Sequence, residues 1–354
     1  MNDKKIIGIG LVGLGGISSK HIGELLKCED AKIVALCDIN TDTLAKKSAQ
    51  LGIPDNKCYT DYLDLINDIE VDAVEVMTPN NLHAKIAIAA LKRGKHVNLE
   101  KPVAMNYAEA LEIVAAKENS QSELMTCFSY RFRPAVRYAK HLVDSGVLGD
   151  IVGLNVSYLK DSALWEGRPL EWRFIKSEAG SGVLGDLGVH LIDLAQLLAG
   201  KVTEVCATKK TIVTERPLLD GSRMGKSETD DSCGFLAAFE CGAEGTFNIT
   251  RCAIGNKNTI KYDVYGTRGS ISFNLNDPSI IDLCAGDGDP KNLSFETVRV
   301  PEEFYLDQER AFIDLILGKR DALLPTVYDG AESQLVIDSI IKSSEERRWI
   351  QINM

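Results

Sequence analysis

The sequence predicts an α/β fold in two parts: a parallel sheet with helices on both faces, followed by an α+β domain with a mostly antiparallel sheet. In the first third of the chain, apolar strand-like runs alternate with helices of about ten residues, as in parallel sheets. After about residue 150, apolar and polar residues alternate one by one, which is typical of a sheet with one buried face. The 354 residues are enough for two domains with separate cores.

The first part begins with a strand, a helix and a second strand. Ile6–Gly13 is an apolar run that ends in glycines, and Lys32–Cys37 is a second run rich in β-branched residues. Between them, Ser18–Cys28 carries apolar residues at helical spacing. The alternation continues with strands over 73–77, 96–99 and 124–128 and with helices over 41–51, 84–92 and 107–118. We therefore expect a series of βαβ units.

The second part is expected to form a sheet with one buried face. Ile151–Lys160 alternates strictly between apolar and polar residues, and Thr259–Tyr265 and Ser270–Leu275 do the same. The segment 266–269, with a glycine at each end, is the turn of the hairpin that joins the last two. An amphipathic helix over Gly330–Ser343 follows, and one option for it is to pack back on the first domain. We expect domains over residues 1–128 and 129–354.

Charge and composition exclude several classes of protein. The net charge is −11 and no lysine or arginine run is longer than a pair, so a nucleic-acid partner is not expected. Nine cysteines without a C-x-x-C pair indicate thiols in a reducing compartment. The first residues lack the apolar segment of a signal peptide, and no apolar run reaches about 18 residues. We therefore expect a cytoplasmic protein without a membrane partner.

A glycine-rich turn follows the first predicted strand. Gly13, Gly15 and Ser18 fit the G-x-G-x-x-G pattern of dinucleotide-binding turns, with serine in the third position. The first glycine permits the tight turn, and the second lets a pyrophosphate approach the backbone at the helix N-terminus. Asp38 follows Ser18 by 20 residues, at the end of the second strand, where a carboxylate binds ribose hydroxyls and repels a 2′-phosphate. These signals favour NAD over NADP; the alternatives are a plain turn and a capping aspartate.

Acid–base chemistry has its best candidates at two places in the chain. Asp186 and His190 lie four positions apart in a helical pattern, so they share one helix face. An imidazole can take and return a hydroxyl proton, and a carboxylate one turn earlier can orient it or bind a substrate hydroxyl. The alternative is an acid that stabilises the helix start beside a structural histidine. Lys101 follows a predicted parallel strand, and it is either a donor to a reacting oxygen or a solvated lysine.

Two of the three tryptophans, Trp165 and Trp172, fall in an irregular segment just before the helix that carries Asp186 and His190. Aromatic side chains at such a place can form a flat wall for a sugar ring or a nicotinamide. The alternative is a small satellite core.

Motifs along the chain together resemble those of the Gfo/Idh/MocA oxidoreductases. These motifs are Gly13-Leu14-Gly15-Gly16-Ile17, Thr78-Pro79-Asn80 with His83, Glu100-Lys101-Pro102, Tyr130-Arg131-Phe132-Arg133-Pro134, Gly185-Asp186-Leu187-Gly188-Val189-His190 and Tyr265-Gly266-Thr267-Arg268-Gly269. The resemblance implies a Rossmann dinucleotide-binding domain followed by an α+β domain with a large open sheet. Such sheets commonly mediate assembly in this family, so a homodimer or homotetramer is expected.

The resemblance also implies hydride transfer between NAD and a secondary hydroxyl or ketone of a sugar, an inositol or a sugar derivative. It assigns Lys101, Asp186 and His190 to catalysis, with His190 as the general acid–base, and it requires no metal. The residues expected to bind the cofactor are Gly13, Gly15, Gly16, Ile17, Asp38, Thr78, Asn80, His83, Glu100, Lys101, Trp172 and Arg173. Those expected to bind substrate are Lys101, Arg131, Trp172, Asp186 and His190. Alternatives are an NAD-using glycosidase or eliminase with transient oxidation, and a non-catalytic dinucleotide-binding sensor.

Overall fold

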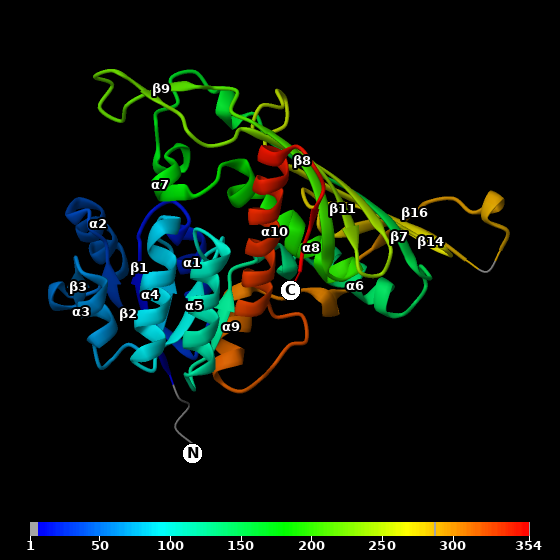
Figure 1. Cartoon of the computed structure of the whole chain (residues 1–354). Coiled ribbons are helices and arrows are strands. Elements are labelled where there is room, and N and C mark those ends of the chain that lie inside the picture. Colours follow the sequence, from blue (N-terminus) through cyan, green and yellow to red (C-terminus); the bar gives the residue numbers. More distant parts are fainter. Residues whose placement is uncertain (1–5, 287, 354) are drawn as a thin grey trace, which may run out of the picture. The chain divides into compact units, whose positions relative to one another are not determined.

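The structure is a computed structural model that describes residues 6–286 and 288–353 (Figure 1). The chain divides into two compact units, one formed by residues up to 129 with 306–331 and the other by 130–305 with the residues from 332 onward. The expected domains placed 306–331 in the second part. This segment groups with the first unit because its helix α9 (Gln308–Ile316) packs on α1 (Ser18–Leu25) and Thr126 donates to the carbonyl of Thr326 at 2.8 Å.

The first unit is built on a six-stranded sheet in the order β3-β2-β1-β4-β5-β6. Every neighbouring pair is parallel, and the order is that of a doubly wound dinucleotide-binding fold. The strands are β1 (Ile7–Val12), β2 (Ala31–Cys37), β3 (Cys58–Tyr59), β4 (Ala73–Val76), β5 (His96–Leu99) and β6 (Leu124–Thr126). Besides α1 and α9, the helices are α2 (Thr41–Leu51), α3 (Tyr62–Asn67), α4 (Asn80–Lys92) and α5 (Tyr107–Glu118).

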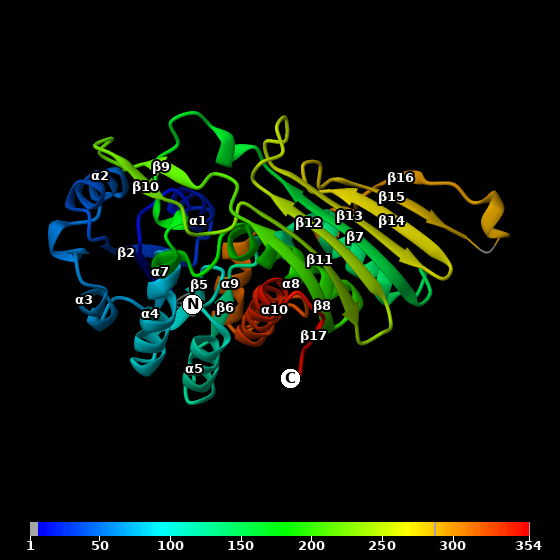
Figure 2. The same cartoon turned by 45° about the horizontal axis from the view of Figure 1, so that its top comes forward.

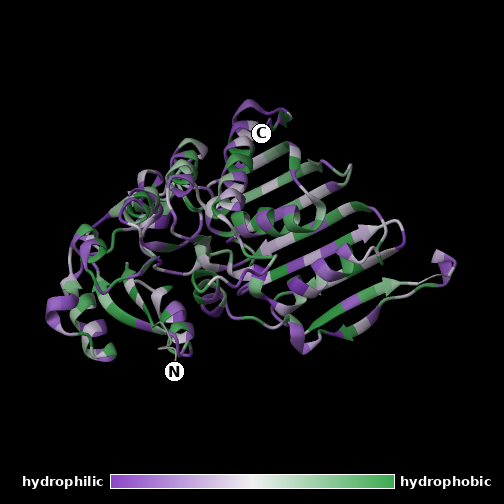
Figure 3. Ribbon diagram, turned by 90° about the horizontal axis from the view of Figure 1, so that it is seen from below, coloured by the Kyte–Doolittle hydropathy of each residue, from purple (hydrophilic) through white to green (hydrophobic). Residues whose placement is uncertain are grey.

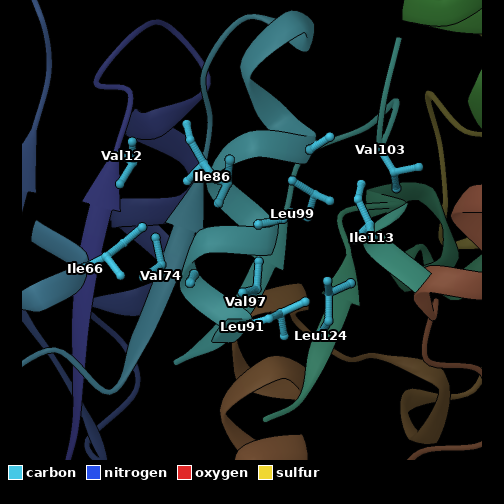
Figure 4. Close-up of a cluster of buried hydrophobic side chains, with 14 of the residues drawn as sticks. Val12, Ile66, Val74, Ile86, Leu91, Val97, Leu99, Val103, Ile113 and Leu124 are labelled. Carbon is cyan, nitrogen blue, oxygen red and sulfur yellow. The ribbon is translucent and has the colours of Figure 1, made fainter. Parts of the chain in front are cut away.

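The central strands of this sheet are buried on both faces. All residues of β1 and β4 are buried, which is why their sequences do not alternate between apolar and polar residues; the one charged residue among them is Glu75. On one face, Ile86 and Leu91 of α4 pack over Val74, Val97 and neighbouring residues (Figure 4). α4 also contacts α3 and α5. The expected parallel sheet of βαβ units is confirmed.

The second unit is built on a nine-stranded sheet in the order β16-β15-β14-β13-β7-β12-β11-β8-β17 (Figure 2). All neighbouring pairs are antiparallel except β7 and β12, which are parallel. The strands are β7 (Ile151–Leu159), β8 (Val202–Lys210), β11 (Ser232–Phe239), β12 (Glu244–Thr250), β13 (Thr259–Gly266), β14 (Gly269–Asn274), β15 (Ile280–Ala285), β16 (Glu296–Arg299) and β17 (Ile350–Gln351). A separate pair is formed by β9 (Glu215–Pro217) and β10 (Met224–Lys226).

One face of the large sheet is covered by helices of its own unit. α8 (Val189–Ala199) packs on β7 and on α6 (Pro134–Asp144). Along β12, exposed and buried residues alternate, and Figure 3 shows hydrophilic and hydrophobic bands alternating along the strands. The last helix, α10 (Val327–Glu346), has residues in both units. The expected α+β unit with a mostly antiparallel sheet is confirmed.

One helical stretch among the described residues is long and apolar enough, by length and composition, to cross a membrane. It runs over Lys176–Ala199 and so includes α7 (Lys176–Ala179) and α8. This corrects the expectation that no stretch reaches that length. Because 83% of its apolar window is buried inside the structure, it has the character of a core helix.

Candidate active site

The glycine turn between β1 and α1 has the conformation that the sequence motif requires. Gly13 has φ +89°, and a Cβ there would lie 2.7 Å from the carbonyl oxygen of Met77, so only glycine fits. A Cβ on Gly15 or Gly16 would meet no described atom within 4 Å. Those two glycines therefore leave open space at the helix N-terminus, as an approaching pyrophosphate needs.

Ser18 occupies the third position of the motif without disturbing the turn. It is buried at the start of α1, and its hydroxyl donates to the carbonyl of Gly15 at 2.7 Å. This hydrogen bond stabilises the turn. Ile17, the residue before it, is among the exposed apolar side chains, which makes it accessible to a ligand at this turn.

Asp38 lies at the end of β2, next to the glycine turn. Its Oδ2 accepts a hydrogen bond from the backbone N–H of Leu14 at 2.7 Å, and its Oδ1 accepts one from Asn40 at 2.8 Å. A carboxylate offers about four lone-pair positions, so ribose hydroxyls can still bind it. The two backbone contacts orient the carboxylate beside the proposed phosphate site.

The loop after β4 carries a buried hydroxyl group, that of Thr78, at the same end of the sheet as the glycine turn. The Thr78 hydroxyl oxygen is buried without a hydrogen-bond partner among the residues that the structure describes. A buried hydroxyl without a partner is costly, so a polar ligand group beside it is stabilising. Asn80, the first residue of α4, is buried next to it in sequence. This orphaned group and the open glycine turn fit a bound dinucleotide.

His83 connects the loops after β4 and β5. Its Nδ1 lies 2.7 Å from the carbonyl oxygen of Pro102 and its Nε2 lies 2.9 Å from that of Thr78. Burial lowers the pKa of His83 despite these two carbonyl partners, so the ring is neutral at neutral pH. The imidazole therefore shapes the loops rather than presenting a charge.

The turn Glu100-Lys101-Pro102 directly follows β5. The backbone N–H of Glu100 donates to Val76 at 3.0 Å, and Glu100 Oε2 accepts the N–H of Lys101 at 3.1 Å. The Lys101–Pro102 peptide is cis, as the sequence allows. Glu100 is buried, and its other carboxylate oxygen lies 3.1 Å from His21 Nε2, so its carboxylate is directed to an internal cluster.

In the second unit, Asp186 lies in a π-helical turn, η5 (Leu184–Gly188), that precedes α8. The sequence predicts an α-helix from this residue onward and misses the wider turn. The start of the turn is held by Asp230, whose carboxylate accepts the N–H groups of Gly182 and Leu184, both at 3.0 Å. Single π-helical turns occur frequently at functional sites.

The Asp186 carboxylate is paired with a buried arginine. Arg251 Nη2 donates to Asp186 Oδ2 at 2.6 Å, and the second arginine nearby, Arg173, has its Nε 3.9 Å from the same oxygen. The Arg251 side chain is buried, whereas Asp186 is partly exposed. A buried cation at this distance keeps the neighbouring carboxylate ionised. Asp186 is therefore a charged acceptor for hydroxyl groups.

His190 lies on the first turn of α8 and is buried against an aromatic ring. The rings of His190 and Tyr130 meet edge to face with centroids 4.5 Å apart. The Tyr130 hydroxyl lies 2.9 Å from that of Tyr158, which donates to Asn258 at 2.9 Å. Burial, with the neighbouring Tyr130, raises the pKa of Tyr158, so its phenol remains protonated. The edge-to-face contact between the rings of Tyr130 and His190 limits rotation of the imidazole.

Arg131 is the site residue whose placement differs most from expectation. Its guanidinium forms a bidentate ion pair with Asp193 of α8, with Nε–Oδ2 at 2.9 Å and Nη2–Oδ1 at 2.5 Å. Only 5% of Arg131 is exposed. The ion pair with Asp193 holds α8 in place, and the expected substrate contact of Arg131 stays a prediction.

Trp172 and Arg173 form the short helical turn η4 (Trp172–Phe174) in the same unit. The Arg173 guanidinium stacks over the Trp172 ring at 4.4 Å, which orients both side chains. Trp165 is more exposed, and its indole N–H donates to Asp161 at 2.9 Å. Through Arg173, the Trp172 segment lies next to Asp186, whereas Trp165 contacts Asp161 and Arg168.

Sequence reasoning missed Arg251, Tyr130 as a neighbour of His190, and the buried set around His21. Arg251 follows β12, far from Asp186 in the sequence, and no local pattern joins them. The only sequence signal for Arg251 was a charged residue directly after the alternating residues of β12. Tyr130 lies in a motif that the resemblance contains, but no pattern indicates its ring contact.

Comparison with known proteins identifies the family of the chain. Residues 7–128 match the model of the oxidoreductase family with an NAD-binding Rossmann fold, and residues 136–272 match the Gfo/Idh/MocA C-terminal domain. The chain is 30% identical over 352 residues to levoglucosan dehydrogenase of Pseudarthrobacter phenanthrenivorans, a match that covers 91% of this chain and 89% of that protein. It is 34% identical over 366 residues to glucose-6-phosphate 3-dehydrogenase of Bacillus subtilis, with 98% of each covered.

Solved structures give the same result. Levoglucosan dehydrogenase in complex with NADH and levoglucosan is similar with a TM-score of 0.90 and 29% identity, and the match covers 99% of this chain and 100% of that one. The six-stranded order and the open glycine turn described above are those of an NAD-binding unit. The chain therefore belongs to the Gfo/Idh/MocA family of oxidoreductases and carries its NAD-binding Rossmann domain.

Proposed function

We propose that the protein transfers hydride between NAD and a secondary hydroxyl or ketone of a sugar, an inositol or a sugar derivative. The observation that carries this proposal is the pairing of a charged hydroxyl acceptor with an acid–base group: Asp186 is held ionised by Arg251, and His190 follows one turn later against Tyr130. Relatives of the chain include a levoglucosan dehydrogenase, a myo-inositol 2-dehydrogenase and a glucose-6-phosphate 3-dehydrogenase, which supports the same substrate class.

NAD, when bound, accepts the hydride at its nicotinamide ring. We propose that the residues holding it are the glycine turn, Asp38 and the loop after β4, namely Gly13, Gly15, Gly16, Ile17, Asp38, Thr78 and Asn80. His83 and Glu100 support this site without binding the cofactor directly, because each side chain makes two contacts with other protein groups.

Three side chains carry the proposed proton chemistry. His190 takes the proton of the reacting hydroxyl during oxidation and returns it during reduction. Asp186 accepts hydrogen bonds from substrate hydroxyls and so orients the ring. Lys101, at the end of β5 in the first unit, donates to the reacting oxygen as negative charge develops on it. Trp172 supplies an aromatic face of the kind that sugar rings and nicotinamide pack against, with Arg173 beside Asp186.

Assembly through the open sheet belongs to the same proposal. Val152 and Leu236 lie in β7 and β11 and are 51% and 46% exposed, which is high for apolar side chains in central strands. A second copy of the chain would cover them in a homodimer or homotetramer. Light scattering coupled to size-exclusion chromatography should give at least a dimer, and Leu236→Glu should shift it toward the monomer. A wild-type monomer would contradict the assembly.

We place the enzyme in the cytoplasm, because its nine cysteines form no disulfide.

The direct test is a screen for NADH formation. Purified protein is mixed with NAD or NADP and with a panel of inositols, aldoses, anhydrosugars and sugar phosphates. The proposal expects NADH formation with at least one polyol and a preference for NAD. Turnover of a glycoside without net NADH would indicate transient oxidation instead. Binding of NADH without any turnover across the panel would indicate a sensor.

A further inference from the structure

A buried polar cluster lies in the first unit below the turn that carries Lys101. It contains His21 from α1, Glu75 from β4, Asn98 from β5, Glu309 from α9 and the side chain of Glu100. All five residues are buried, and His21 is only 1% exposed. The proposed function gives the first four no role. A polar cluster of this size in a sheet core is costly unless each group is satisfied, so its contacts are informative.

Both ring nitrogens of His21 face carboxylate oxygens. Nδ1 lies 3.1 Å from Glu75 Oε2 and 2.9 Å from Glu309 Oε1, and Nε2 lies 3.1 Å from Glu100 Oε1. An ionised carboxylate accepts hydrogen bonds and donates none, so both nitrogens must carry protons. The ring is therefore an imidazolium. Although burial disfavours this charge, Glu309 and the hydrogen bonds to the carboxylates raise the pKa of His21 well above its ordinary value.

Glu75 and Glu309, the two carboxyl groups near Nδ1 of His21, hold one proton between them. Burial and the charge of Glu309 raise the pKa of Glu75, whereas burial of Glu309 is outweighed by His21, which lowers its pKa. Glu75 thus holds the proton and Glu309 is ionised. Asn98 Nδ2 donates to both carboxyl groups, at 2.9 Å to Glu75 Oε2 and 3.1 Å to Glu309 Oε2. The arrangement leaves two carboxylates, Glu309 and Glu100, on the two sides of one cation.

The cluster is connected to the active-site lysine through Glu100. One carboxylate oxygen of Glu100 contacts His21, and the other accepts the backbone N–H of Lys101 at 3.1 Å. On the far side of the same turn, His83 Nδ1 lies 2.7 Å from the carbonyl oxygen of Pro102. The backbone around Lys101 is therefore held from both sides by buried histidines.

We propose that His21 is a positioning residue for the reaction: it holds the Glu100 carboxylate, and Glu100 in turn fixes the backbone of Lys101. Without the imidazolium, the Glu100 carboxylate loses the hydrogen bond that fixes one of its oxygens, and the carboxylate can turn. The N–H of Lys101 then loses its acceptor, and the lysine shifts. Misplacement of a reacting group by about 1 Å can reduce turnover by about 100-fold. The inference rests on the proposed role of Lys101.

A double-mutant cycle with His21→Gln and Lys101→Ala tests this coupling. We expect His21→Gln to lower kcat by roughly 10- to 100-fold while the Kd of NADH, measured by fluorescence titration, changes less than about 3-fold. The combined variant should be no slower than Lys101→Ala alone, because His21 acts only through that lysine. His141→Gln, an equivalent change on α6 away from both sites, serves as the matched control and should retain wild-type kcat.

The outcomes separate the two proposals. Wild-type kcat for Lys101→Ala would refute the proposed function. A slow Lys101→Ala with unchanged kcat for His21→Gln, or with effects that multiply in the combined variant, would refute the positioning role alone. If His21→Gln does not fold, Glu100→Gln replaces it in the same cycle with the same expectations. One equivalent of divalent metal bound by the wild type and lost in His21→Gln would show that a metal, not a proton, occupies Nδ1, and would overturn the proposal.

Discussion

Replacing Glu75 by glutamine should stabilise the protein, and increasingly so as the pH rises. Glu75 is fully buried in β4, and burial with the charge of Glu309 raises its pKa to about 8. Glutamine has nearly the same shape and carries no charge. Its amide oxygen can accept from His21 and Asn98 as Glu75 Oε2 does. Its NH2 group takes the place of Glu75 Oε1, which has no hydrogen-bond partner among the described residues.

The magnitude follows from proton linkage. The ordinary pKa of this carboxyl is 4.5, so between that pH and about 8 the folded protein holds a proton that the unfolded chain has released. The stability from this proton is complete below pH 4.5 and is lost as the pH rises, by about 1.4 kcal/mol per pH unit. At pH 7 the loss is roughly 3 kcal/mol. Glu75→Gln avoids it, and Cys127 does not interfere because burial raises the pKa of that thiol.

Calorimetric unfolding between about pH 5 and pH 8 is the assay. The midpoints of wild type and Glu75→Gln should nearly coincide at the acid end and separate by several degrees at the alkaline end, at roughly 2–4 °C per kcal/mol. Glu309→Gln is the matched control: it removes an ionised partner of His21 and should destabilise by roughly 3 kcal/mol. A Glu75→Gln protein that is less stable than wild type near pH 8, or whose difference does not change with pH, would refute the charge assignment.

Three further substitutions test the site. Arg251→Met removes the cation beside Asp186 and should lower kcat/KM for the polyol by roughly 10- to 100-fold. The control Arg216→Met changes another buried arginine of the same unit and should reduce stability but keep kcat. Equal kinetic losses in the two variants would argue against a special role for the pair of Arg251 and Asp186. Asp38→Asn removes the charge and keeps one side-chain oxygen, which can accept only one of the two backbone N–H groups that Asp38 binds. The ratio of kcat/KM for NAD over NADP should fall by about 10-fold or more, and an unchanged ratio would dissociate this carboxylate from cofactor choice. Gly13→Ala places a methyl group 2.7 Å from a backbone oxygen at positive φ and should abolish NADH binding in a fluorescence titration; wild-type affinity would contradict the geometry of the turn.

The features that the sequence could predict are the local ones. Five of the six parallel strands follow from apolar runs separated by helical spacing, whereas the two-residue strand β3 was not predicted. The glycine turn with Asp38 follows from a fixed interval along the chain. The hairpin of β13 and β14 likewise follows from alternation on both sides of a short turn.

The features that escaped prediction depend on contacts between distant segments. His21, Glu75 and Glu309 come from three separate elements, and only the packing of α9 on α1 brings the last of them to the first two. Arg251 reaches Asp186 in the same way, across two elements. The π-helical turn at Asp186 is selected by tertiary contacts, since helical periodicity over five residues does not separate it from an α-helix.

The measurement that tests the central claim most directly is the rate of NADH formation by wild type and His190→Ala with the best polyol of the panel. If His190 is the acid–base group, kcat for His190→Ala should fall by roughly 10²- to 10⁴-fold while NADH binding persists. His141→Ala, which replaces an exposed histidine whose ring lies near Tyr138 and Phe304, should keep the wild-type rate. A His190→Ala enzyme that forms NADH at the wild-type rate would contradict the account.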